Sequence, residues 1–298
     1  LRAVTEAHLF ELYSELIAPV RSRCSGNHLV VVPHGFLHHV PFHALTDGER
    51  FLIDDFTISY APSASVYRLC CAKPPSDHQT SLVMGVPHPS LPHVQAEVEA
   101  VARALPSPVV LLGKKATHEQ LRTVGAESRF IHIATHGHVR RDNPMFSSID
   151  LGTGPLSLFD LYQLDLSADL VTLSGCSTGV NVVTGGDEVV GLVRGLLYSG
   201  ARAVLLTLWD AYDRSTAAFM TAFYKGLSES RSKSAALRFA MQEVRAEFPH
   251  PFYWAPFVLV GPDGASGSPG EGHPGTGGTV RRTLPFRPRI FPRPGRHP

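Results

Sequence analysis

Residues 169–179 have the sequence DLVTLSGCSTG, an apolar run followed by small residues around one cysteine. The apolar run is typical of a buried β-strand, and the small residues after it would leave a side chain approachable. Two neighbouring side chains at this strand end are candidates for a nucleophile. Cys176 is a thiol there, whereas Ser177 is the centre of Gly175-Cys-Ser-Thr-Gly179, which fits the G-x-S-x-G pattern of serine hydrolases.

Similar apolar runs recur along the chain and alternate with stretches of helical periodicity. Such alternation, with nearly continuous apolar strands, predicts an α/β fold whose mostly parallel sheet is covered by helices on both faces. From residue 81 onward there are six expected strands, enough for one complete domain. The expected strands are 28–32, 57–61, 81–86, 108–112, 130–135, 169–174, 201–208 and 257–261, and the clearest helices are 93–105, 187–200, 213–227 and 232–248.

Changes of composition divide the chain into three parts. Residues 1–75 contain a helix and fewer strands, so we expect a smaller α/β lobe or an extension of the main sheet. The Pro-containing segment 71–80 is the natural boundary, and 76–261 form the main domain. Residues 262–298 are rich in Gly, Pro and Arg without an apolar period, which predicts a disordered tail, either a basic contact segment or a solvated extension.

Composition limits the function classes. The 298 residues are 43% hydrophobic and 18% charged with a formal net charge of +1, so no global field favours nucleic acid or an anionic membrane. No apolar stretch approaches the roughly 20 residues that span a bilayer. The four cysteines form no C-x-x-C motif, and no secretion signal opens the chain, so we expect a cytoplasmic location, no metal and no cofactor. Because the first residue is Leu1, we expect a piece of a longer protein.

Three predicted strand ends carry reactive side chains. His136-Gly137-His138 follows the strand at 130–135, Cys176 follows the strand at 169–174, and Asp210 and Asp213 follow the strand at 201–208. Ligands of open parallel sheets bind outside the carboxyl ends of the strands. The sequence therefore predicts that an imidazole, a thiol and two carboxylates meet at one edge, where the imidazole can exchange protons with the thiol.

Other interpretations of these residues stay open at this point. Cys176 could be a small buried side chain. His132, His136 and His138 could bind a metal, although no acidic residue lies near them before Asp142. A serine hydrolase built on Ser177 would need a helix directly after Gly179 and a histidine downstream; residues 180–186 intervene, and the downstream histidine of the folded part is His250.

Seven segments together resemble a known family, the CHAT domain. They are VVPHGFLHHVPFHAL (31–45), FTISYAPSASV (56–66), FIHIATHGH (130–138), LVTLSGCSTG (170–179), GGDEVVGLVRGLLYSGARAVLLTLWD (185–210), DRSTAAFMTAFYKGL (213–227) and HPFYWAPFVLVG (250–261). CHAT domains are grouped with caspases and separases among the caspase-like cysteine peptidases, and they usually follow tetratricopeptide repeats. The resemblance covers residues 8–261 and implies a caspase-like three-layer sandwich with a mostly parallel six-stranded sheet, preceded by a smaller, non-catalytic pseudo-protease lobe.

The resemblance also implies roles for individual residues. His136 matches the family's catalytic histidine and Cys176 its nucleophile, with the N–H groups of Gly137 and Cys176 as oxyanion donors. The segment LWDAYD is similar to one that holds a basic P1 side chain in separases, which makes Asp213, and secondly Asp210, substrate-binding candidates. One departure is His34-Gly35, where the family often has Asp-Gly; it lies outside the catalytic half.

The function implied is that of a cysteine endopeptidase that cleaves after a basic residue under the control of upstream repeats or a partner. Its partners would be a protein or peptide substrate and the tetratricopeptide repeats, with no nucleic acid and no membrane. The alternatives are a catalytically silent CHAT signalling or scaffold module and, less favoured, the serine hydrolase built on Ser177.

Overall fold

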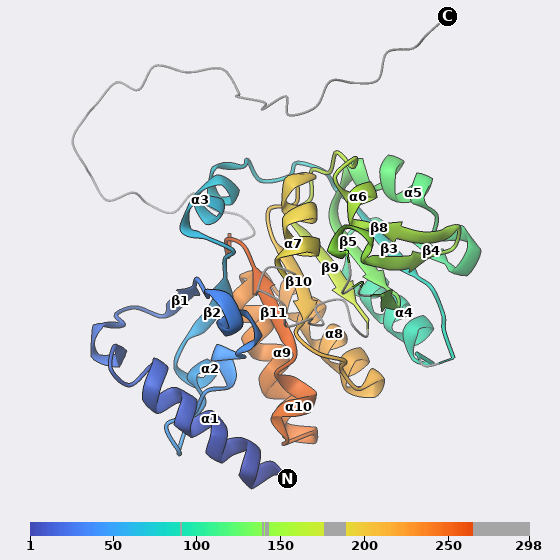
Figure 1. The fold of residues 1–298 in the computed structure, drawn as a ribbon. Helices are drawn as coiled ribbons and strands as arrows, with labels where there is room; N and C mark the ends of the chain where they lie inside the picture. Colours follow the sequence, from blue (N-terminus) through green and yellow to red (C-terminus); the bar gives the residue numbers. More distant parts are fainter. Residues whose placement is uncertain (90, 139, 141–142, 176–188, 265–298) are drawn as a thin grey trace, which may run out of the picture. The chain divides into compact units, whose positions relative to one another are not determined.

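A computed structural model of the chain describes residues 1–89, 91–138, 140, 143–175 and 189–264. In that part the strands form one eight-stranded sheet and a small three-stranded sheet (Figure 1). The large sheet contains β1 (His28–Val31), β2 (Thr57–Tyr60), β3 (Thr80–Gly85), β4 (Pro108–Leu112), β5 (Ser128–Ala134), β9 (Leu170–Ser174), β10 (Val204–Thr207) and β11 (Phe257–Val260). The small sheet contains β6 (Gly137–His138), β7 (Ser148–Leu151) and β8 (Gly154–Ser157).

The strands of the large sheet are ordered β1-β2-β11-β10-β9-β5-β3-β4. The five strands from β10 to β4 are parallel, β11 runs antiparallel to β10, and β2 and β1 run parallel to β11. The predicted mostly parallel α/β sheet is confirmed. The sheet has two strands more than the six expected. β2 pairs with the outer edge of β11 at Tyr60 and Val260, and β1 pairs with the other side of β2.

Helices cover both faces of this sheet (Figure 1). Adjacent residues of β11 point to opposite faces, and each meets a different helix. Phe257 stacks on Phe219 of α8 with ring centroids 3.6 Å apart, whereas Val258 lines a small apolar pocket together with Val193 of α7. The helices are α1 (Arg2–Leu16), α2 (Leu52–Asp55), α3 (Ala64–Ala72), α4 (Val94–Ala104), α5 (His118–Thr123), α6 (Leu158–Leu161), α7 (Val189–Tyr198), α8 (Asp213–Ser228), α9 (Lys233–Glu247) and α10 (Pro251–Trp254).

The central strands have continuous apolar sequences because helices cover both of their faces. Every residue of β9, β10 and β11 is buried, so each face of each strand needs an apolar or hydrogen-bonded side chain. Within the described residues, no helix combines the length and the apolar character that crossing a bilayer requires. The predicted tail at 262–298 lies, apart from its first three residues, outside the described residues.

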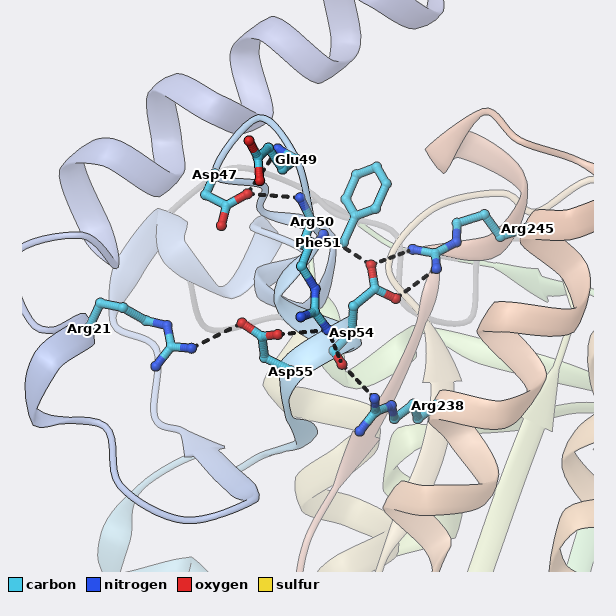
Figure 2. Close-up of polar contacts among 9 residues, drawn as sticks. All are labelled: Arg21, Asp47, Glu49, Arg50, Phe51, Asp54, Asp55, Arg238 and Arg245. Atoms are coloured by element: carbon cyan, nitrogen blue, oxygen red, sulfur yellow. Dashed lines mark hydrogen bonds and ion pairs between the residues drawn. The ribbon is translucent and has the colours of Figure 1, made fainter.

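Charged residues fix the first part of the chain to α9 (Figure 2). The Asp54 carboxylate of α2 accepts two hydrogen bonds from the Arg245 guanidinium, at 2.6 and 3.0 Å, and Arg238 donates to the Asp54 carbonyl oxygen. Next to it, Asp55 forms ion pairs with Arg21 and Arg50, both at 3.0 Å. Bidentate pairs of this kind are the geometrically specific form of a salt bridge. They fix the position of α2 against the helix layer.

An Asp54→Asn variant should be destabilised by about 1–2 kcal/mol at pH 7, because the charge that Arg245 binds is removed. Partial burial alone would raise the pKa of Asp54, but hydrogen bonds and charge from Arg245 outweigh it and hold the pKa below its ordinary value. A carboxyl whose pKa is depressed on folding stabilises the protein above its unfolded pKa and loses that contribution as the pH falls through the folded pKa. Urea unfolding at pH 7 and at pH 3 should therefore show a difference between variant and wild type that shrinks in acid.

The matched control is Glu247→Gln, which removes the exposed pair of Glu247 with Arg214 at 2.7 Å. Exposed pairs contribute little, so this variant should stay within about 0.5 kcal/mol of wild type. Equal losses in the two variants would contradict the role given to Asp54.

Candidate active site

The three strands with reactive residues at their ends lie next to one another in the sheet. Ala134 of β5 pairs with Ser174 of β9, and the Thr135 N–H donates to the Ser174 carbonyl at 2.9 Å. On the other side of β9, the Thr207 hydroxyl of β10 donates to the Gly175 carbonyl at 3.3 Å. Cys176 and Ser177 lie outside the described residues. In the sequence, Cys176 follows Ser174 by the same two residues that separate His136 from Ala134.

His136 lies among aromatic and charged side chains. Its ring stacks on that of His88 with centroids 5.3 Å apart, and it meets the ring of His138 edge to face at 5.0 Å. Its Nδ1 is buried and has no hydrogen-bond partner among the described residues. Burial lowers the pKa of His136, and the neighbouring imidazoles of His138 and His88 lower it further, against the opposing carboxylates of Asp150 and Asp210. The lowered pKa favours the uncharged imidazole, which is the form that accepts a proton.

A short hairpin after β5 sets the surroundings of this histidine. β6 pairs with β7 in the register Gly137 with Ile149, and the Asp150 N–H donates to the His136 carbonyl at 2.9 Å. That bond makes Gly137 and Ile149 a non-hydrogen-bonded pair, so the Gly137 N–H points away from β7. This N–H is one of the two that the family resemblance implies as oxyanion donors.

A small acidic pocket lies against the last described residue before Cys176. It is lined by Leu91, Val94, Glu97, Ser174, Gly175, Ala211, Asp213 and Thr216. Three of its buried oxygen atoms have no hydrogen bond in the described part of the chain, namely Glu97 Oε1, Ser174 Oγ and Thr216 Oγ1. The pocket therefore offers carboxylate and hydroxyl acceptors that a donor-rich cation would satisfy.

The two carboxylates of the pocket come from two helices. Asp213 begins α8, and its carboxylate accepts the backbone N–H of His93 at 2.9 Å. Burial raises the pKa of Asp213, and the like charge of Glu97 adds to this effect, while the bond from His93 opposes it. Glu97 Oε1 lies 3.1 Å from Nε2 of His132, but these two atoms do not form a hydrogen bond. A cation bound between the two carboxylates would relieve the effect of Glu97 on Asp213.

The residues predicted for the site lie in different places in the structure. His136 and Gly137 lie at the strand edge described above, and Asp213 lines the acidic pocket. Asp210 is exposed and does not line the pocket, but its charge acts on His136. His132 is fully buried and bonded to Tyr224 at 3.2 Å, so it belongs to the core and not to a set of ligands with His136.

Neither Glu97 nor His88 was predicted from the sequence as a site residue. Glu97 had a recognisable signal, since it lies on the apolar face that Val94, Val98 and Val101 give to the predicted helix. An acid on such a face is buried and needs a partner or a function. His88 had no such signal, because its position depends on the unpredicted pairing of β3 with β5.

Comparison with known proteins agrees with this architecture. The CHAT domain model matches residues 6–262. Tetratricopeptide repeat protein 28 of Mus musculus is 30% identical to the chain over 327 aligned residues, and the human protein of the same name is 28% identical. In each case the alignment covers 87% of this chain and 13% of the relative, so the chain spans only a small part of the curated relatives it matches.

Solved structures of cysteine peptidases share the fold. Separase in the Saccharomyces cerevisiae separase–securin complex superposes with a TM-score of 0.60 at 20% identity, over 86% of this chain and 17% of that one. The Arg-specific cysteine proteinase gingipain R, whose pro- and mature-domain complex is known from Porphyromonas gingivalis, superposes with a TM-score of 0.60 at 9% identity, over 88% of this chain and 68% of that one. The predicted caspase-like fold is thereby confirmed.

Proposed function

This chain belongs to the CHAT domain family, and on that premise we propose that it is a cysteine endopeptidase that cleaves after a basic residue. Cys176 is the nucleophile and His136 the acid/base. The observation that carries the proposal is the acidic pocket at Gly175, directly before Cys176 in the sequence, on the strand next to the one that presents His136.

The proposed reaction balances as an acyl transfer followed by hydrolysis. The sulfur of Cys176 bonds to the peptide carbonyl carbon while its proton passes to His136, and the oxyanion is held by the N–H groups of Gly137 and Cys176. The leaving amine takes the proton from His136 as the C–N bond breaks. Water then hydrolyses the thioester and restores the thiol. The lowered pKa of His136 supports this role, because the uncharged ring can accept the thiol proton at neutral pH.

The acidic pocket supports a basic P1 side chain. A guanidinium or ammonium group would donate to oxygen atoms of Glu97, Ser174 and Thr216 that otherwise lack hydrogen bonds. It would also offset the burial of Asp213 and the like charge of Glu97, which together raise the pKa of Asp213. The Arg-specific proteinase among the structural neighbours has the same fold, which agrees with this assignment as an analogy.

An Asp213→Asn variant should cleave P1-arginine peptides about 100-fold less efficiently, because one carboxylate that binds the buried cation becomes neutral. The measurement is kcat/KM for fluorogenic peptides that differ only at P1, with arginine, lysine or glutamine. The preference for arginine over glutamine should fall by the same factor. Asp165→Asn, at an exposed aspartate away from the pocket, is the matched control and should keep the wild-type preference. A preference unchanged in Asp213→Asn would exclude this pocket as the P1 site.

A labelling experiment separates the peptidase from the silent scaffold module. The probe is a P1-arginine peptide that ends in a thiol-reactive ketone. Labelling of Cys176 that disappears in His136→Ala supports the enzyme. Labelling of Cys176 at the same rate as the exposed Cys71, with or without His136, supports the scaffold.

Repeats outside this chain would regulate the enzyme. Both curated relatives are named as tetratricopeptide repeat proteins, and 87% of this chain corresponds to only 13% of their length. We therefore expect the natural protein to carry such repeats beside the peptidase domain, where they recruit a protein substrate or an activating partner.

A further inference from the structure

The imidazole of His136 lies between two other imidazoles that come from different elements. His88 belongs to the loop between β3 and α4, and its ring is within 16° of parallel to that of His136. His138 belongs to β6 and meets the ring at 75°. A third group, the Asp150 carboxylate of β7, is 2.8 Å from Nε2 of His138.

One carboxylate close to His136 is thus bonded to the neighbouring His138 instead. In Ser-His-Asp sites a carboxylate bonded to the imidazole fixes its tautomer and its plane. Here Asp150 bonds to His138, and Nδ1 of His136 has no hydrogen bond within the described residues. Among the described residues, contact with the flat faces and edges of neighbouring rings is therefore what we expect to fix the plane of His136.

We propose that His88 is a positioning residue for His136: it fixes the plane of that imidazole by stacking and, being so close to it together with His138, disfavours a positive charge on that ring. The structural part of this proposal stands on the ring geometry alone. Its catalytic consequence rests on the peptidase function proposed above.

The sheet register places His88 where the proposal needs it. Gly85 of β3 pairs with Ala134 of β5, and the Val86 N–H donates to the Ala134 carbonyl at 2.9 Å. The turn after His88 is closed by a hydrogen bond from the Leu91 N–H to the His88 carbonyl at 2.8 Å. Leu91 is 4% exposed and lines the acidic pocket. The His88 side chain is exposed, but its backbone is held at both ends.

The charged groups that face His136 come from four elements and act in opposite directions. The neighbouring imidazoles of His138 and His88 disfavour a positive charge on His136, whereas the carboxylates of Asp150 and Asp210 favour it. Together with burial, which is the largest contribution, the two imidazoles prevail, and the pKa of His136 is lowered. Replacing the imidazole of His88 by a ring that cannot be protonated should therefore raise the pKa of His136.

The test is an NMR titration of the Cε1–H signal of His136 in the 298-residue chain, with His136→Gln to assign it. His88→Phe keeps a flat ring for stacking but removes the charge, so the midpoint should rise by about half a pH unit, as expected for a solvent-screened neighbour. His88→Ala should raise the midpoint similarly and also increase the mobility of the ring, seen in relaxation of the same signal. His8→Phe, at a side chain that is 70% exposed on α1, is the matched control and should change neither.

An unchanged His136 midpoint in both His88 variants would overturn the charge role, and unchanged ring mobility in His88→Ala would overturn the positioning role. Neither readout requires catalysis, so the titration decides the proposal even if the wild type cleaves no peptide. Where peptides are cleaved, the acid limb of kcat/KM should move to higher pH in His88→Phe with its plateau within about 2-fold of wild type, and the plateau of His88→Ala should fall about 10-fold.

Discussion

A Cys176→Ala variant is expected to lose cleavage of P1-arginine peptides by about 1000-fold or more in kcat/KM, because the covalent route through the thioester is removed. A Ser177→Ala variant should keep activity within about 10-fold. The two substitutions each remove one nucleophilic atom from neighbouring positions of the same small-residue segment. They therefore serve as matched controls for each other.

The measurement is steady-state cleavage by the two variants and the wild type, each first shown to unfold at the same temperature. The acid/base role predicts that His136→Ala shares the loss, and that combining it with Cys176→Ala adds little, because residues that act as a unit are not additive. If Ser177→Ala is the inactive variant and Cys176→Ala is active, the serine hydrolase that the G-x-S-x-G pattern allowed is the correct interpretation. If none of the proteins, the wild type included, cleaves a peptide, the catalytically silent scaffold is favoured, whereas undiminished cleavage by every variant would exclude both Cys176 and Ser177 as the nucleophile.

The strands of the large sheet were predictable because burial on both faces leaves a continuous apolar signal. All eight runs identified in the sequence are strands of that sheet, including 28–32 and 57–61 in the first part of the chain. The small sheet was not predicted. Its strands have two to four residues and include Gly154 and Pro155, so they lack an apolar run and depend on pairing with one another.

The surroundings of the candidate site were predictable only in part, for the same physical reason. Residues at strand ends could be proposed from the sequence, because parallel strands present their carboxyl ends at one edge. What faces them depends on strand order and hairpin pairing. Pairing of β3 with β5 brings His88 to His136, and pairing of β6 with β7 brings Asp150 to His138. Both are tertiary contacts without a local sequence signal.

Which of the two acids after β10 lines the pocket was likewise difficult to predict from the sequence. Asp210 and Asp213 lie three residues apart in one loop, and the sequence favoured Asp213 only weakly. In the structure Asp213 is the first residue of α8, with 13% of its side chain exposed, and it lines the pocket with Glu97, whereas Asp210 is exposed. The start of the helix decides which acid turns inward, and helix ends are hard to locate from sequence.

A Gly175→Ala variant is expected to be destabilised by about 3 kcal/mol or more, because an added Cβ would meet the backbone of the neighbouring strand. That atom would lie 1.6 Å from the Thr135 carbonyl oxygen and 2.8 Å from its carbon. The obstacle cannot rotate away, since Thr135 donates its N–H to Ser174 and its hydroxyl to the Asp150 carbonyl at 2.6 Å. The ends of β5 and β9 would have to separate, and His136 and the acidic pocket would separate with them.

Guanidinium unfolding at equilibrium measures this loss, and Gly191→Ala is its matched control. Gly191 lies in α7, where the nearest atom to an added Cβ is the flexible Leu158 side chain at 3.2 Å, and alanine favours a helix over glycine. The control should be neutral or more stable by about 0.5 kcal/mol. Equal stability of the two variants would mean that β5 and β9 do not approach each other as closely as the structure has them. A Gly175→Ala variant of normal stability that still lacks activity would instead locate the effect in the segment that leads to Cys176.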